Sequence, residues 1–307
     1  MFESLYYVPD YRGRNVLFDL FLRIWGYPIY IRRLEARSIF RMLGDIRGKT
    51  VLDLGCGDGF LSIPMSKRNA RVIGIDINAQ KLTLAKERFA KVSLPIEPAL
   101  VVADARRLPF KDGVFDAVES NCVIEHIPND DAVFREVSRV IRDDGLFVAT
   151  MPSEEGKSII PLMALWIRSP RWLRKLFAPR YLVENEFGSV KEARAYLKRQ
   201  VLAESQNYTR QGLYDQLAAA GFEVKDFEYL IQFFGAVVQD FVFGLRAIFL
   251  NVGTALLFPI VYPITLLDRL FISKDVVGEE FAFLAWKQKE ARVPPVFDGE
   301  TRTLDSP

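Results

Sequence analysis

The sequence predicts an α/β protein built on a doubly wound, mostly parallel β-sheet. Two observations predict this fold class. Between residues 50 and 151, short aliphatic runs alternate with segments whose apolar residues recur at helical spacing. The aliphatic runs lack interleaved polar residues, as expected of strands buried on both faces. With 307 residues, 50% of them hydrophobic and 26% charged, the chain is long enough to bury such a sheet.

The expected elements follow one another in a regular order. Strands are expected at residues 50–54, 71–75, 99–103, 115–120 and 146–151. Helices are expected at residues 60–70, 78–90 and 130–142. Parallel sheets bind ligands beyond the carboxyl ends of their strands, so the loop after the first strand is the first candidate for a site.

That loop reads GCGDG and occupies residues 55–59. Its three glycines allow a sharp turn and the close approach of a ligand to free backbone amides. Asp76 ends the second strand, 21 positions after Gly55, where a carboxylate can accept hydrogen bonds from two ribose hydroxyls. Asp53 precedes the glycines, and its charge favours a cationic amino group over a pyrophosphate. We therefore expect a positively charged nucleoside as the ligand.

The chain resembles the class I S-adenosylmethionine-dependent methyltransferases of the small-molecule type, such as those of quinone biosynthesis. The matching segments are VLDLGCGDG, VIGIDIN, VVADARRLPF, FDAVESNCVIEHI and EVSRVIRDDGLFVATMP, in the family's order, within residues 48–152. Residues 213–224 resemble the family's last helix and sixth strand, and residues 281–289 its seventh strand. The resemblance implies a Rossmann-like sheet of seven strands with an antiparallel last strand, and S-adenosyl-L-methionine as the cofactor.

The resemblance also implies a set of cofactor-binding residues. The methionine part would lie at Asp53 and the glycine loop, the ribose at Asp76, and the adenine at Asp104 with Ala105. The whole set is Asp53, Gly55, Cys56, Gly57, Gly59, Asp76, Ile77, Asp104, Ala105, Asn121 and Cys122.

Several of these residues have a structural alternative. Asp53 could cap the turn that follows it, and Asp76 could be the N-cap of the next helix. Asp104 could be a turn residue. Cys56 is expected as a small packed residue rather than a nucleophile, because nothing near it in sequence would lower its pKa.

Methyl transfer from a sulfonium is an in-line displacement with a neutral leaving group, so positioning and desolvation can supply much of the acceleration. For a hydroxyl acceptor, His126 is the candidate general base and Glu125 a weaker one. The same EHIP segment could instead be a structural turn. One histidine and two distant cysteines offer no metal-ligand spacing, so we expect no metal site.

Three segments are more hydrophobic than ordinary connections. Residues 14–41 and 159–183 combine apolar and aromatic residues with arginines, which is typical of helices at a membrane interface and also of a lid over an active site. Residues 247–267 carry no charge over 21 positions. Because strands expected on either side belong to one sheet, this insertion must leave and return on the same side of a membrane. A shallow or re-entrant anchor is favoured over a buried subdomain or dimer interface.

The expected organisation has six parts. They are an amphipathic helical region at 1–46, a cofactor-binding core at 47–152, a helical insertion or lid at 153–207, the rest of the core at 208–232 and 279–291, a hydrophobic hairpin and probable anchor at 233–278, and a flexible tail at 292–307.

The sequence favours a methyltransferase that acts on a lipid-like or isoprenoid small molecule. We expect it in the cytoplasm, associated peripherally or monotopically with the inner face of the cell membrane. The net charge of +2 and the absence of an Asn-Pro-Pro-aromatic motif argue against a nucleic-acid substrate. Alternatives are a non-catalytic cofactor-binding membrane scaffold, a soluble methyltransferase whose insertion is a dimer interface, and a nicotinamide-dependent oxidoreductase. The sequence predicts no oligomeric state.

Overall fold

The structure is a computed structural model that describes residues 30–156, 208–238, 263–273 and 276–288, with the single residues 20 and 260. Most of the expected N-terminal region before residue 30 lies outside the described residues. So do almost all of the expected lid, the middle of the expected hairpin and the expected tail.

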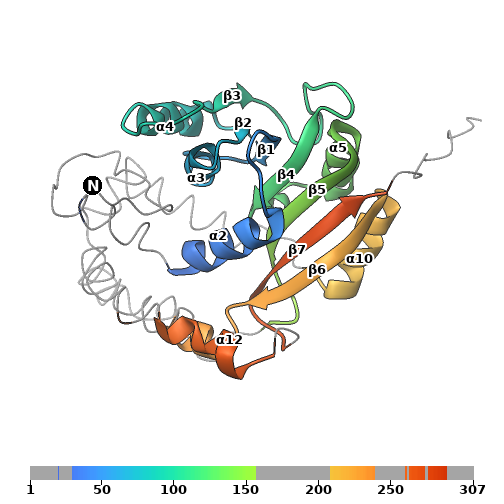
Figure 1. Cartoon of the computed structure of the whole chain (residues 1–307). Helices are drawn as coiled ribbons and strands as arrows, with labels where there is room; N and C mark the ends of the chain where they lie inside the picture. Colours follow the sequence, from blue (N-terminus) through green and yellow to red (C-terminus); the bar gives the residue numbers. More distant parts are fainter. Residues whose placement is uncertain are drawn as a thin grey trace, which may run out of the picture.

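A seven-stranded sheet forms the centre of the molecule (Figure 1). Its strands are β1 (Thr50–Leu54), β2 (Arg71–Asp76), β3 (Ala99–Val102), β4 (Phe115–Asn121), β5 (Ile141–Pro152), β6 (Phe222–Leu230) and β7 (Glu280–Lys287). They lie in the order β3-β2-β1-β4-β5-β7-β6. Strands β1 to β5 are parallel, and β7 is antiparallel to both of its neighbours. The expected sheet is therefore confirmed, including the antiparallel last strand.

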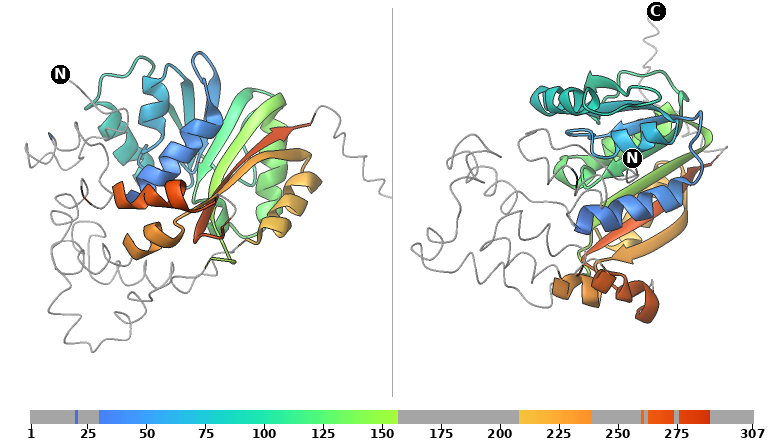
Figure 2. Two further views of the ribbon diagram at one scale, coloured as in Figure 1. Left: turned by 60° about the horizontal axis from the view of Figure 1, so that its bottom comes forward. Right: turned by 60° about the vertical axis from the view of Figure 1, so that its left-hand side comes forward.

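Helices cover both faces of the sheet (Figure 2). They are α2 (Tyr30–Leu43), α3 (Ser62–Lys67), α4 (Ala79–Phe89), α5 (Asp130–Val140), α10 (Arg210–Ala219) and α12 (Leu267–Phe271). Buried residues of α2 share a core cluster with one face of the sheet, and those of α5 and α10 share a cluster with the other. The result is a three-layer sandwich whose two cores are separated by the sheet.

Strand β5 begins earlier than the sequence predicts. The expected helix at 130–142 ends at Val140, and Ile141 starts the strand, pairing with Phe115. Ile141 is fully buried, so pairing removes both its side chain and its backbone from water. The polar residues that follow form an irregularity in the ladder, with Asp144 in the left-handed conformation.

Side chains alternate between the two faces of each strand, and this alternation determines which residues meet beneath α2. Val51, Ala117 and Val148 belong to the core cluster on the α2 face. Residues two positions further along β1, β4 and β5 share that face. They are Asp53, Glu119 and Thr150, so the face becomes polar at the carboxyl ends of the strands.

The insertion between β6 and β7 begins and ends at one place, because Leu230 pairs with Glu280. Two polar side chains hold its ends together. Gln232 Nε2 donates to the carbonyl oxygens of Ser273 and Val276, at 2.8 and 2.6 Å. Asp268 accepts from the amides of residues 234 and 235, both at 2.7 Å. We call these contacts the clasp. Both ends of the insertion therefore lie at the same end of the sheet. No helix among the described residues has the length and apolar character needed to span a bilayer.

Candidate functional site

The glycine loop follows β1 at the point where the strand order reverses between β1 and β4. Its three glycines have different roles. A Cβ on Gly55 would lie 2.4 Å from Val123, and one on Gly59 would lie 2.6 Å from Phe89, so both positions are filled by packing. A Cβ on Gly57 would meet nothing nearer than 4.0 Å. The expectation of an open glycine loop thus holds for Gly57 alone, which is where a ligand can approach the backbone.

Asp76 is fixed at the end of β2 by two backbone amides. It accepts from Gly57 N at 3.1 Å and from Asn78 N at 2.8 Å. The N-cap of α4 is Asn78, which accepts from the amides of the first helical turn, so the alternative role of Asp76 as N-cap is wrong. Ile77, beside it, is 70% exposed. A ligand that contacts Gly57 would therefore meet a positioned carboxylate and an exposed apolar side chain.

Asp53 and Glu119 lie side by side because β1 and β4 pair in register at these residues. Both are buried, and Asp53 accepts a hydrogen bond from Ser62 Oγ at 2.5 Å. Burial raises the pKa of both groups, and the charge of Asp53 raises the pKa of Glu119 further. Both side-chain oxygens of Glu119 are buried without a hydrogen-bond partner in the described structure, beside the Asp53 carboxyl group. Within the described part of the chain, no basic side chain pairs with either carboxyl group.

This arrangement fits the amino acid end of S-adenosylmethionine. A buried carboxylate without a cationic partner is costly, and an ammonium group would remove that cost. The open backbone at Gly57 leaves room for the nucleoside, and Asp76 offers acceptors for its ribose.

Asp104 is a turn residue in this structure. It accepts from the backbone amide of Arg106 at 2.9 Å and forms an ion pair with the Arg106 side chain at 2.6 Å. The pairing lowers the pKa of Asp104, so the group is a carboxylate. Ala105 is buried against the core. The adenine contact stays a prediction for both residues.

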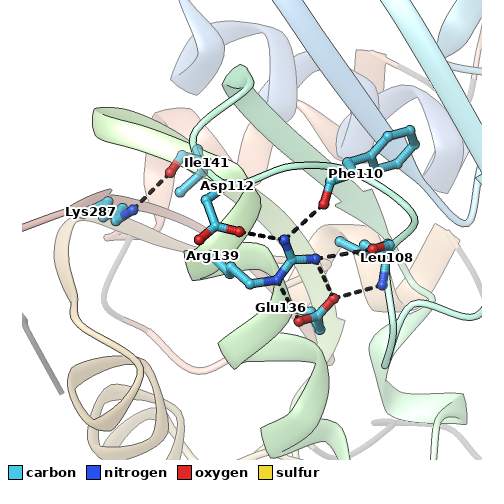
Figure 3. Close-up of polar contacts among 7 residues, drawn as sticks. All are labelled: Leu108, Phe110, Asp112, Glu136, Arg139, Ile141 and Lys287. Atoms are coloured by element: carbon cyan, nitrogen blue, oxygen red, sulfur yellow. Dashed lines mark hydrogen bonds and ion pairs between the residues drawn. The ribbon is translucent and has the colours of Figure 1, made fainter. Parts of the chain in front are cut away.

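Arg139 of α5 holds the loop that follows Asp104 in place through hydrogen bonds to its backbone (Figure 3). The guanidinium donates to the carbonyl oxygens of Leu108 and Phe110, at 3.0 and 2.8 Å. It also bonds to the carboxylates of Asp112 and Glu136. These contacts fix the loop at the adenine end of the expected site.

Asn121 and Cys122, at the end of β4, meet a residue that sequence reasoning missed. Asn121 Nδ2 donates to Glu35 Oε2 at 2.9 Å, and the Cys122 thiol donates to Glu35 Oε1 at 3.7 Å. Cys122 has a left-handed backbone, with φ of 51°, which turns the chain at this point. Glu35 lies on α2 beside buried Leu34. An acid on the apolar face of an amphipathic helix is the signal that could have indicated it.

His126 lies in the short 3₁₀ turn Ile124–His126 after β4, and its side chain is 45% exposed. Its Nε2 atom is 3.7 Å from Glu125 Oε1. Burial lowers the pKa of His126, and the charges of Lys81 and Arg32 lower it further. Burial raises the pKa of Glu125 to about 8. At neutral pH the imidazole is therefore the group that is free to accept a proton.

The two cysteines are free thiols. Burial raises the pKa of both, so neither is a thiolate nucleophile in the structure as it stands. Cys56 packs beneath Gly74, whose Cβ would lie 2.8 Å from the Cys56 sulfur. This position agrees with the expected role of Cys56 as a small packed residue.

Comparison with known proteins places part of the chain in a family. Residues 52–149 match the family described as "Methyltransferase domain". The ubiquinone biosynthesis O-methyltransferase of Chromobacterium violaceum is 36% identical over 109 residues, which cover 34% of this chain and 46% of that protein. The demethylmenaquinone methyltransferase of Lactobacillus johnsonii is 33% identical over 129 residues, which cover 41% of this chain and 53% of that protein. The matched region thus spans about half the length of these curated relatives.

The fold has solved counterparts. An S-adenosylmethionine-dependent methyltransferase from Mesorhizobium loti aligns with a TM-score of 0.51 and 16% sequence identity, covering 82% of this chain and 96% of that one. At this identity the likeness concerns the fold.

Replacing Asp76 tests the expected ribose contact. Asp76→Ala should weaken S-adenosylhomocysteine binding at least about tenfold, because hydrogen bonds to a charged group contribute roughly 1.5–3 kcal/mol each. Isothermal titration calorimetry measures the affinity. Glu97→Ala, at an exposed carboxylate outside the site, is the control and should bind as the wild type does. An unchanged affinity of the folded Asp76→Ala variant would refute the ribose contact.

Proposed function

We propose that this chain, which belongs to the class I S-adenosylmethionine-dependent methyltransferases through its residues 52–149, methylates a lipid-like small molecule at a membrane surface. One observation carries the proposal. The buried Asp53–Glu119 pair, without a basic partner among the described residues, lies at a glycine loop that is open only at Gly57. This combination supports binding of a nucleoside that ends in an ammonium group.

S-adenosylmethionine, when bound, supplies an electrophilic methyl group. The residues of this chain would hold it in three places. Asp53 would bind the ammonium group, Asp76 the ribose hydroxyls, and the loop of Asp104 and Ala105 the adenine. Asn121 and Cys122, held by Glu35 and Thr150, would line the cofactor.

His126 is the proposed base for a hydroxyl acceptor. Three ionisable groups lie around it: Glu125 within its own turn, Lys81 from α4 and Arg32 from α2. Burial and the charges of the two cations lower the pKa of the imidazole, and its partial exposure leaves it accessible to an acceptor. A neutral imidazole at this position can remove the hydroxyl proton as the methyl group is transferred.

Two observations support a lipid-like acceptor. Of the two relatives described above, one is named a ubiquinone biosynthesis O-methyltransferase and the other a demethylmenaquinone methyltransferase, and both names refer to quinones. In addition, apolar side chains are exposed around the clasp, and Leu270 and Phe271 are 74% and 75% exposed. The exposed set is Phe233, Val237, Ile260, Ile264, Leu270, Phe271, Val276 and Val277. A surface of this kind supports contact with a membrane.

The acceptor class can be tested with labelled cofactor. The protein is incubated with deuteromethyl S-adenosylmethionine and an extract of membrane lipids and quinones, and the products are followed by mass spectrometry. We expect one labelled methyl group on a lipid-soluble molecule, and none with Asp53→Asn, which removes the proposed ammonium partner. Cofactor binding without any labelled product would support the non-catalytic alternative instead.

Membrane contact can be tested separately. The double variant Leu270→Asp and Phe271→Asp should lose most of its co-flotation with phosphatidylcholine and phosphatidylglycerol vesicles, since charged groups resist transfer into the interface. The control is Ile96→Asp with Val114→Asp, which changes two exposed apolar residues away from the clasp. If both double variants float equally well, the clasp surface is not the contact. A change of molar mass in light scattering would assign it to a dimer interface.

The role of His126 predicts a specific pH dependence. A base works in its deprotonated form, so activity falls as the pH drops through its pKa, and the midpoint of that acid limb should lie below 6.5 because the pKa is lowered. His126→Gln should reduce kcat by about 10²–10⁴-fold and abolish this limb. The affinity for S-adenosylhomocysteine should stay the same. A retained acid limb in His126→Gln would show that another group is the base.

A further inference from the structure

A compact group of side chains lies beneath α2, at the carboxyl end of β4 and the amino end of β7. Glu35 comes from α2, Cys122 follows β4, and Glu280 begins β7. One ligand atom from each of the three lies within 4.8 Å of the others. These residues are far apart in the sequence, and for that reason ligand spacing did not predict a metal site. The fold alone brings them together.

The two oxygens of Glu35 face different partners. Oε2 accepts from Arg32 at 3.2 Å and from Asn121 at 2.9 Å. Oε1 faces the Cys122 sulfur at 3.7 Å. The charged and amide donors therefore orient the carboxylate through one oxygen and leave the other directed at the thiol.

The charge of the group is not balanced by the described residues around it. Glu35, Glu125 and Glu280 are three carboxyl groups, and Arg32 is the cation recorded beside them. With Cys122 as a thiolate, the fully ionised group and Arg32 together carry a net charge of −3, which one divalent cation would reduce to −1.

A second observation indicates a ligand. Glu125 is 3% exposed, and its Oε2 atom has no hydrogen-bond partner in the described structure. The same is true of the buried Oε2 atom of Glu280. The Glu125 carboxyl group lies close enough to Cys122 and Glu280 to interact with them electrostatically. Two buried carboxyl oxygens without hydrogen-bond partners in the described structure, one of them on Glu280 of the cluster itself, are available as ligands.

We propose that Glu35, Cys122 and Glu280 bind one Zn²⁺ ion, with Glu125 beside it. The ligand set favours this ion, because Zn²⁺ accepts both thiolate and carboxylate ligands, whereas Mg²⁺ and Ca²⁺ require oxygen. On binding, the Zn–S bond forms as the Cys122 proton leaves to solvent. Three protein ligands leave a fourth position open. If the proposed methyltransferase function holds, that position would take the acceptor oxygen and lower its pKa.

Metal binding is measured on the full chain without substrate. Zn²⁺ is titrated in competition with a chromophoric chelator, and Co²⁺ is added separately to detect the thiolate-to-cobalt charge-transfer absorption. We expect one Zn²⁺ per chain, with affinity reduced at least tenfold in Glu280→Gln and the Co²⁺ band absent in Cys122→Ser. Cys56→Ser changes the other cysteine of the chain and should keep both signals.

Two further measurements separate loss of the zinc site from misfolding and from loss of the proposed function. Circular dichroism checks that each variant is folded, and at the same Zn²⁺ concentration the melting temperature of the wild type should rise more than that of Glu280→Gln. Absence of saturable Zn²⁺ binding, or a Co²⁺ band that persists in Cys122→Ser, would overturn the site. S-adenosylhomocysteine affinity is measured on the same samples. Its retention in a protein without Zn²⁺ binding would reject the zinc site and leave the proposed function standing.

Discussion

The register between β1 and β4 is the constraint on which the site depends. It sets Asp53 beside Glu119, and the alternation of the strands turns both toward the face that α2 covers. Each carboxyl group is removed from water by the same packing that stabilises the sheet. Burial weakens the hydration of the charge but strengthens its attraction to a cation that enters the same space. The lost hydration of the buried carboxyl groups would therefore favour a positively charged ligand over a neutral or negative one.

The antiparallel strand β7 contributes a further acidic residue, Glu280, on the other side of the site. Since β7 lies between β5 and β6, Glu280 enters the sheet opposite both Pro152 and Leu230. The same topology makes the long insertion leave and return at that edge, where the clasp joins its ends. An acid and an apolar surface are thus attached to one end of the sheet. This arrangement supports an acceptor that reaches a polar site from an apolar phase.

Sequence patterns predicted those features of the fold that depend on residues close together in the chain. The parallel strands and the glycine loop follow from aliphatic runs and turn residues, whereas the seven-stranded sheet with its antiparallel last strand is expected only from the family resemblance. The distinction between Gly57 and Gly55 could not be predicted, because it depends on Val123, which packs there from a distant loop. Glu35 and Glu280 were not predicted as site residues for the same reason. Glu280 looks like an ordinary surface acid in sequence, Glu35 differs from one only in lying on the apolar face of its helix, and the fold alone brings the two together.

In the proposed function, the matched family region binds the cofactor and the rest of the chain contacts the acceptor. Residues 52–149 contain Asp53, Asp76 and the glycine loop, which would bind the cofactor in the proposed function. Glu35, Glu280 and the clasp lie outside that region, on elements that contact the carboxyl end of β4 or the adjoining sheet edge. Relatives that use the same cofactor need the same cofactor-binding surface, whereas relatives with different acceptors need different acceptor-binding surfaces. If the proposed function holds, the residues that select the acceptor are therefore to be sought on α2, β7 and the insertion, which lie outside the region shared with the relatives.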